Sequence, residues 1–191
     1  VYRKWEGPLW EPDKPSIVLV AFGTSTAYGF ARFRFPVRRT MQIAQRLYEG
    51  VDLGSGERVG LITYMRTDSV RVSGDAIAAV RDVIQTTFGA KALPDKPNFF
   101  KNRSSAQDAH EAIRPSDVGR SPEQLASSLS ADELKLYTLI WQRFVASQMT
   151  PAQFDVTDVL VTCGRYGLKA RGEVEVDPGY LRAYRDDGET A

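Results

Sequence analysis

The sequence predicts an α+β fold, in which a mainly helical block at residues 24–149 is inserted between two ends that carry strands. The strongest observation is at residues 131–149, where apolar side chains recur every three to four positions, the spacing of one buried helix face. Residues 36–49 show the same spacing. Between residues 154 and 176 apolar and polar side chains alternate instead, which indicates two paired strands.

The remaining elements follow from local signals. The helix at 36–49 is expected to begin at Pro36, since proline suits a first helical position, and to end at Gly50. Its predicted buried stripe consists of Val37, Met41, Ala44, Leu47 and Tyr48. Outside the helices, the sequence predicts a strand at 17–22, a glycine-rich loop at 51–58 and a short strand or extended segment at 60–65. Further helices are predicted between Ser73 and Gly89, at 106–113 and from Ser121 onward. Ser130 and Glu133 form a capping box for the helix at 131–149.

Length and composition limit the class of protein. The chain has 191 residues, of which 42% are hydrophobic and 26% charged, values that allow a packed core. No apolar run approaches the roughly 20 residues that span a bilayer, and no signal peptide is recognised. Cys163 is the only cysteine, so this chain alone forms neither a disulfide framework nor a cysteine-rich zinc site. We therefore expect a cytoplasmic protein with no metal site of its own.

Basic residues concentrate near the start of the helical block, although the formal net charge is only +1. Within residues 30–50 five arginines stand against one glutamate. Three of them, Arg38, Arg39 and Arg46, belong to the helix at 36–49 and could face phosphates. A solvated helix surface explains the same charges, and both explanations stay open.

Residues 62–69, Ile-Thr-Tyr-Met-Arg-Thr-Asp-Ser, carry side chains suited to attack on a phosphodiester. The phenol of Tyr64 could be the nucleophile if its proton is removed and the developing charge is stabilised. In an extended segment Arg66 lies on the same face, where its guanidinium could bind the same phosphate. Asp68 could orient Arg66 or help to hold a metal, and Thr63 adds a hydroxyl that could bond to a phosphate oxygen. A tyrosine beside an arginine is also an ordinary half-buried pair, so this segment alone does not establish catalysis.

A second polar segment, at residues 109–115, contains His110, the only histidine of the chain. With Glu111 and Arg114 it could contact a phosphate and move a proton. A capped helix end with a salt bridge is the structural alternative. A zinc site is not indicated, because no second histidine or cysteine lies at ligand spacing.

Taken together, these segments resemble the type IA DNA topoisomerases, and the bacterial topoisomerase I branch in particular. The resemblance extends from about residue 38 to residue 171. Its motifs lie at residues 39–49, 60–69, 107–116, 136–137, 140–141 and 144–151. Several motifs in the same order are far more specific than any one of them.

The resemblance implies a mechanism. Tyr64 attacks single-stranded DNA and becomes linked to a 5′ phosphate, another strand passes through the break, and resealing relaxes negative supercoils without ATP. Arg66 is expected to steady the scissile phosphate, and His110 to contact DNA near the break. The expected DNA-binding or supporting residues are Thr63, Asp68, Glu111, Arg114, Arg38, Arg39 and Arg46.

The resemblance also implies a division into domains. The family's helical tyrosine-bearing domain is inserted in a strand-rich arch, which gives a poorly matched arch segment at 1–23, the helical domain at 24–149 and a second arch segment at 150–191. The family binds Mg²⁺ in a separate Toprim domain, which nothing in this chain matches, and residues 27–31 depart from the family's usual sequence. We therefore expect a monomeric, nucleoid-associated fragment that binds single-stranded DNA, is inactive alone and needs the Toprim and remaining core domains as partners.

Two other classes of function fit the sequence. One is a non-catalytic module that binds single-stranded DNA through the helix at 36–49, with Tyr64 only packed. The other is an inert remnant. A tyrosine recombinase or type IB enzyme would join tyrosine to a 3′ phosphate and would need a widely spaced Arg-His-Arg set, for which the sequence gives no support.

Overall fold

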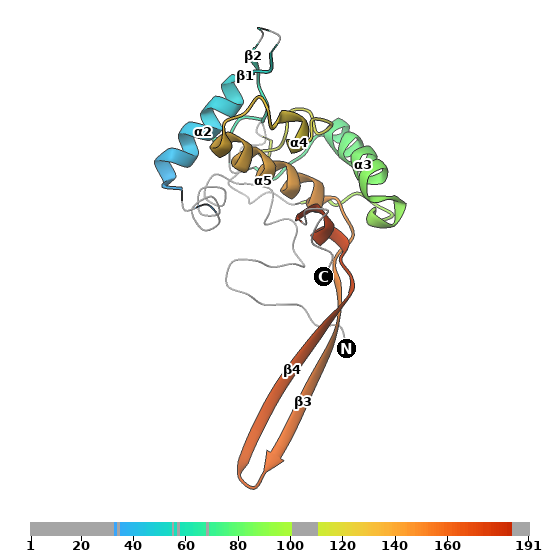
Figure 1. The fold of residues 1–191 in the computed structure, drawn as a ribbon. Helices are drawn as coiled ribbons and strands as arrows, with labels where there is room; N and C mark the ends of the chain where they lie inside the picture. Colours follow the sequence, from blue (N-terminus) through green and yellow to red (C-terminus); the bar gives the residue numbers. More distant parts are fainter. Residues whose placement is uncertain are drawn as a thin grey trace.

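The computed structural model describes residues 33, 35–54, 56, 58–67, 69–100 and 111–184. It consists of a helical body from which a long two-stranded hairpin projects (Figure 1). The α-helices are α2 (Val37–Glu49), α3 (Gly74–Phe88), α4 (Pro122–Leu125) and α5 (Ala131–Ser147), and 3-10 helices span Ala90–Ala92 and Gly179–Tyr184. The strands are β1 (Val51–Asp52), β2 (Arg58–Val59), β3 (Gln153–Cys163) and β4 (Tyr166–Asp177). The predicted α+β class is confirmed, whereas the predicted strand at 17–22 lies outside the described residues.

Helix α5 is the centre of the helical body. It packs against α2, α3, α4 and the 3-10 helix Gly179–Tyr184. The predicted apolar face is confirmed, because Tyr137, Ile140 and Phe144 are 0%, 4% and 1% exposed. None of the helices in the described ranges is long and apolar enough to cross a membrane.

Two aromatic side chains of α5 also bond to the loop that precedes α4. The hydroxyl of Tyr137 donates to the carbonyl of Arg120 at 2.7 Å, and the indole of Trp141 donates to the carbonyl of Val118 at 2.8 Å. Burial raises the pKa of the Tyr137 phenol, and the nearby charge of Asp117 adds to this effect while Arg120 opposes it. Tyr137 is therefore a structural tyrosine that stays protonated.

Helix α5 begins at the predicted capping box. The Ser130 hydroxyl accepts from the backbone N–H of Glu133 at 3.5 Å, and the Glu133 carboxylate accepts from the backbone N–H of Ser130 at 3.0 Å. Arg46 of α2 pairs with the same carboxylate at 2.9 Å, and Arg39 pairs with Asp132 at 2.6 Å. The basic face of α2 is thus joined to the acidic first turn of α5.

Helix α2 ends at Gly50 as predicted but begins at Val37, with Pro36 as its N-cap, and the predicted buried stripe is wrong at its two ends. Its buried residues are Thr40, Ile43, Ala44 and Leu47. Val37 is 57% exposed and Tyr48 is 40% exposed. The stripe that meets the core is centred on the middle of the helix, and the Tyr48 ring contacts Tyr64 instead.

The segments on either side of α3 differ from the prediction in two places. Residues 51–58, predicted as a loop, contribute the antiparallel strands β1 and β2. In the predicted extended segment at 60–65 the only ladder contact among the described residues is the bridge between Ile62 and Pro115. Residues 111–113 are not helical, and the rest of the short helix predicted there lies outside the described ranges. By contrast, α3 is confirmed between its cap at Ser73 and Gly89.

The predicted strand pair is confirmed as the β3–β4 hairpin, which keeps one register from Phe154 and Glu175 to Cys163 and Tyr166 and shifts register between Gln153 and Phe154. Most of its side chains are exposed; Leu160, for example, is 75% exposed. After β4 the chain returns to the body, where the N–H of Tyr180 donates to the carbonyl of Thr150 at 2.8 Å.

We expect the contribution of Glu133 to stability to depend on pH. Burial opposes its charge, but the hydrogen bonds from Ser130 and the charge of Arg46 prevail and lower its pKa below the ordinary 4.5. Stability from this carboxylate is therefore present above pH 4.5 and is lost as the pH falls through the lowered pKa. Denaturant unfolding should show Glu133→Gln to be about 1 kcal/mol less stable at neutral pH, with the difference from wild type shrinking below about pH 4.

The matched control is Asp155→Asn on the exposed hairpin, which should change stability by less than about 0.5 kcal/mol at either pH. A difference between wild type and Glu133→Gln that stays constant from neutral to acid pH would contradict the assigned role of the carboxylate.

Candidate nucleic-acid cleavage site

Residues 60–67, which we call the tyrosine segment, bury most of their apolar side chains and expose two polar ones. Leu61, Ile62 and Met65 are 1–2% exposed, and Thr67 is 3% exposed. Tyr64, by contrast, is 42% exposed, and Arg66 is also exposed. The buried side chains hold the backbone to the core, while the side chains of Tyr64 and Arg66 reach solvent.

Residues 111–116, which we call the bracing segment, run alongside the tyrosine segment. The N–H of Thr63 donates to the carbonyl of Arg114 at 2.9 Å. The N–H of Ser116 donates to the carbonyl of Leu61 at 3.0 Å. These two bonds flank the Ile62 bridge and form one short antiparallel pairing between segments about 50 residues apart in sequence.

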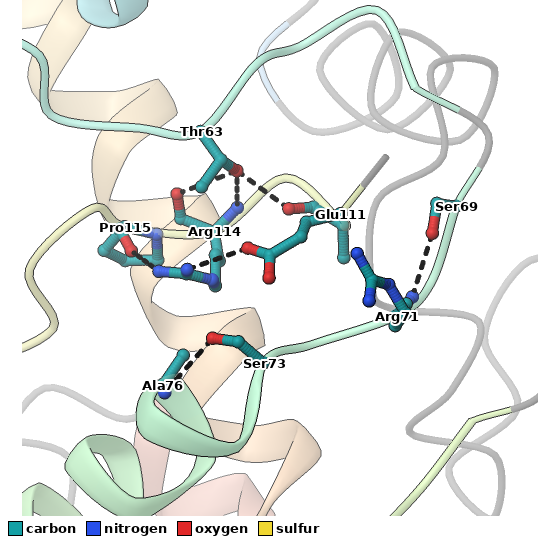
Figure 2. Close-up of polar contacts among 9 residues, drawn as sticks. Thr63, Ser69, Arg71, Ser73, Ala76, Glu111, Arg114 and Pro115 are labelled. Atoms are coloured by element: carbon teal, nitrogen blue, oxygen red, sulfur yellow. Dashed lines mark hydrogen bonds and ion pairs between the residues drawn. The ribbon is translucent and has the colours of Figure 1, made fainter. Parts of the chain in front are cut away.

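The hydroxyl of Thr63 adds two further bonds to this pairing (Figure 2). It donates to the carbonyl of Ala112 at 2.7 Å and accepts from the N–H of Arg114 at 3.0 Å. The N–H of Ala112 in turn donates to the carbonyl of Arg71 at 2.8 Å. The bracing segment therefore holds the chain both before and after Tyr64, and the Thr63 hydroxyl faces protein rather than a phosphate.

Two of the predicted supporting residues form an ion pair within the bracing segment. A guanidinium nitrogen of Arg114 lies 2.8 Å from the Glu111 carboxylate, and the other donates to the carbonyl of Pro115 at 3.0 Å (Figure 2). The two side chains are 14% and 25% exposed, respectively. This geometry gives Glu111 and Arg114 a structural role in shaping the bracing segment.

Downstream of Arg66 the chain turns through buried hydroxyls. The hydroxyl oxygen of Thr67 accepts from the N–H of Ser69 at 3.0 Å, and that of Ser69 accepts from the N–H of Arg71 at 3.2 Å. Such side-chain to backbone bonds shape a turn without a regular ladder. The other predicted site residues of these motifs, Asp68 and His110, lie outside the described residues.

The end of α2 lies directly against the tyrosine segment. The N–H of Leu61 donates to the carbonyl of Leu47 at 2.7 Å. A Cβ on Gly60 would lie 2.7 Å from the carbonyl oxygen of Tyr48, so glycine is required for this approach. The rings of Tyr48 and Tyr64 meet edge to face with centroids 5.4 Å apart. The sequence interpretation missed Tyr48 as part of the site because helical spacing placed it in the core.

The three predicted DNA-binding arginines of α2 differ in surroundings. Arg39 and Arg46 are about half exposed, at 49% and 52%, and form the ion pairs with α5 described above. Arg38 is exposed at the start of the helix. The ion pairs of Arg39 and Arg46 are therefore with α5 and not with the tyrosine segment.

A cavity of about 380 Å³ lies behind the bracing segment, lined by the start of α3, by α5 and by Arg114, Pro115 and Asp117. Neither Tyr64 nor Arg66 lines it. Within the described ranges no group of three or more His, Cys, Asp or Glu residues could hold a metal ion. Tyr64 itself is 42% exposed to solvent.

Thr63→Val removes the hydroxyl while keeping the shape of the side chain. We expect a loss of about 1–3 kcal/mol in the free energy of unfolding, because the N–H of Arg114 and the carbonyl of Ala112 lose a partner in a half-buried pairing. The control is Thr86→Val on α3, whose hydroxyl bonds only to carbonyls of its own helix. Equal losses for the two variants in denaturant unfolding would contradict the bracing role.

Gly60→Ala should strain the junction between α2 and the tyrosine segment. The added methyl would press on the carbonyl of Tyr48, and we expect a destabilisation of about 1–3 kcal/mol, visible as a lower Tm. Gly74→Ala is the matched control, since a Cβ there meets open space at the start of a helix. A Tm for Gly60→Ala equal to that of the control would show that the close approach is not maintained in solution.

Comparison with known proteins places this geometry in a family. The sequence profile of the DNA topoisomerase family matches residues 20–191. DNA topoisomerase 1 of Xylella fastidiosa is 50% identical over 154 residues, which are 80% of this chain and 19% of the relative. DNA topoisomerase 1 of Escherichia coli is 49% identical over 170 residues, or 87% of this chain and 18% of the relative.

The fold shows the same relationship. The structure of full-length topoisomerase I from Thermotoga maritima superposes on the whole of this chain with a TM-score of 0.76 and 36% identity, and the match covers 29% of that protein. This chain spans about a fifth of the length of the curated relatives it matches. The chain therefore belongs to the DNA topoisomerase family, and corresponds to a segment of the type IA enzymes.

Proposed function

We propose that this chain is the strand-cleaving part of a type IA topoisomerase and that Tyr64 is its nucleophile. One observation carries the proposal: Tyr64 and Arg66 emerge together from a segment that the core and the bracing segment hold in place. Among the other tyrosines in the described ranges, Tyr137 and Tyr180 are buried and Tyr166 lies on the projecting hairpin. Tyr48 is as exposed as Tyr64, but the residue two positions after it is Gly50 rather than an arginine. An exposed phenol suits attack on a long polymer.

The proposed reaction exchanges one phosphate ester for another. The Tyr64 Oη attacks the phosphorus of a phosphodiester, the Oη–P bond forms and the bond from phosphorus to the 3′ oxygen breaks. The phenol proton leaves Tyr64, and the released 3′ oxygen takes up a proton, so no charge or atom is gained. In the reverse step the 3′ hydroxyl attacks the phosphotyrosine and restores the strand. The ester bond is conserved throughout, which is why no ATP is needed.

In this proposal Arg66 binds the non-bridging phosphate oxygens. A guanidinium matches phosphate in a two-pronged geometry, and preorganised positive charge stabilises the extra negative charge of the transition state. Thr63, Glu111 and Arg114 act by holding the segment that presents Tyr64. His110 keeps the role that the family resemblance implies, contact with DNA near the break, and Asp68 the role suggested by its place two residues after Arg66, orientation of Arg66.

The proposed substrate is a single strand of DNA. Arg38, Arg39 and Arg46 are proposed to attract its phosphates, with Arg39 and Arg46 doing so from their half-exposed ion pairs with α5.

We also propose that a Mg²⁺-binding domain and the remaining core domains of a longer, monomeric, nucleoid-associated parent complete the reaction. Supercoil relaxation and strand passage belong to this parent, and the chain alone is proposed to be inactive.

Replacing Tyr64 by Phe should abolish covalent capture of DNA. The test inserts the entire 191-residue chain in place of the matching segment of Escherichia coli DNA topoisomerase 1 and mixes the chimera with a labelled single-stranded oligonucleotide. We expect a denaturant-stable protein–DNA adduct that disappears in Tyr64→Phe, because the phenyl ring has no oxygen to bond to phosphorus. Apparent DNA affinity should change by less than about twofold, since the phosphate contacts remain.

Tyr166→Phe is the matched control, an exposed tyrosine of the β3–β4 hairpin that should leave the adduct unchanged. DNA binding without an adduct in the parent chimera would favour the non-catalytic binding module. A folded chimera that binds no DNA at low salt would favour an inert remnant.

A further inference from the structure

The contact between Tyr48 and Tyr64 is not used by the proposed reaction, yet it lies at the nucleophile. The two rings meet at an interplanar angle of 68° with centroids 5.4 Å apart. Both are exposed to a similar degree, 40% for Tyr48 and 42% for Tyr64. We propose that Tyr48 is a positioning residue, whose ring holds the Tyr64 phenol in the orientation that attacks DNA. This inference rests on the proposed function of Tyr64.

Tyr48 can serve this purpose because its own backbone is fixed. Its neighbour Leu47 is fully buried, and the carbonyl of Leu47 accepts the N–H of Leu61 at 2.7 Å. The helix end is closed by the N–H of Gly50, which donates to the carbonyl of Arg46 at 3.0 Å. Gly60 brings the tyrosine segment against the carbonyl of Tyr48 itself. The backbone of Tyr48 is therefore in direct contact with the segment that carries Tyr64.

The backbone around Tyr64 is constrained as well. Thr63 is bonded to the bracing segment, and Met65 is 1% exposed, so the backbone on both sides of Tyr64 is held. An exposed tyrosine side chain can exchange among its staggered χ1 positions, and the Tyr48 ring is one contact that limits this exchange for Tyr64. Contact with a fixed ring favours the position in which the rings meet edge to face.

A positioning role requires an aromatic ring at residue 48. The edge-to-face attraction comes from the ring quadrupole, so a phenylalanine at this position should serve almost as well as tyrosine. A leucine fills similar space without a ring and should not. Because Tyr48 is 40% exposed, neither change opens a cavity in the core, and both variants are expected to fold.

The first test uses the full 191-residue chain and needs no catalysis. Tyr64 is replaced by 3-fluorotyrosine and its ¹⁹F NMR signal is recorded in wild type, Tyr48→Phe and Tyr48→Leu. We expect the signal of wild type and Tyr48→Phe to be displaced from that of the denatured chain by the neighbouring ring, and the signal of Tyr48→Leu to move toward the denatured position. A Tyr48→Leu signal identical to wild type would overturn the contact.

The second test measures the rate of adduct formation in the chimera that carries the whole chain, at saturating oligonucleotide, together with the apparent Kd. If Tyr48 positions Tyr64, the rate of adduct formation should be about three- to tenfold lower in Tyr48→Leu and within about twofold of wild type in Tyr48→Phe. The Kd for the oligonucleotide should stay within about twofold of wild type in both variants. Tyr166→Leu serves as the control for loss of an exposed ring and should have no effect.

The outcomes separate this inference from the function on which it rests. An adduct that needs Tyr64 but forms at full rate in Tyr48→Leu would overturn the positioning role and leave Tyr64 as the nucleophile. A weaker Kd with an unchanged saturated rate would overturn it in favour of a stacking contact between Tyr48 and a DNA base. Absence of any adduct in the parent chimera would overturn the proposed function, and the catalytic meaning of the Tyr48 contact with it.

Discussion

The short antiparallel pairing between the tyrosine segment and the bracing segment is the constraint on which the rest of the site depends. Two backbone bonds and two bonds of the Thr63 hydroxyl join stretches about 50 residues apart. Without this pairing the exposed residues around Tyr64 would form a surface loop, and such loops sample many conformations. With it, the phenol of Tyr64 stands on a backbone that the folded core defines. The predicted second motif is therefore a structural support for the first.

Much of the fold could be predicted from the sequence because its signals are local. Ser73 and Ser130 cap the starts of α3 and α5, Gly50 and Gly89 end α2 and α3, and the β3–β4 hairpin follows from alternation along each strand. Burial on α5 was predictable because its periodic apolar face packs against three other helices. The motif at Tyr64 could be found because its residues are adjacent in sequence.

What could not be predicted depends on contacts between distant residues. Spacing places Tyr48 on a buried stripe, but only the close approach at Gly60 shows that its ring meets Tyr64. The charge of α2 suggests a phosphate-binding surface, but the acidic first turn of α5 that pairs with Arg39 and Arg46 lies about 90 residues away in sequence. Residues 111–113 show helical potential locally, but the backbone groups of Ala112 bond to Thr63 and Arg71. In each case a tertiary contact overrides the local pattern.

The central claim is that Tyr64, and no other tyrosine, forms a bond to the 5′ phosphate of a cleaved strand. The most direct measurement is mass spectrometry of the trapped adduct after exhaustive nuclease and protease digestion. The account predicts one modified peptide, containing Tyr64, whose attached nucleotide is joined through its 5′ phosphate and keeps a free 3′ end. A nucleotide joined through its 3′ phosphate, or attached to a tyrosine other than Tyr64, would contradict it.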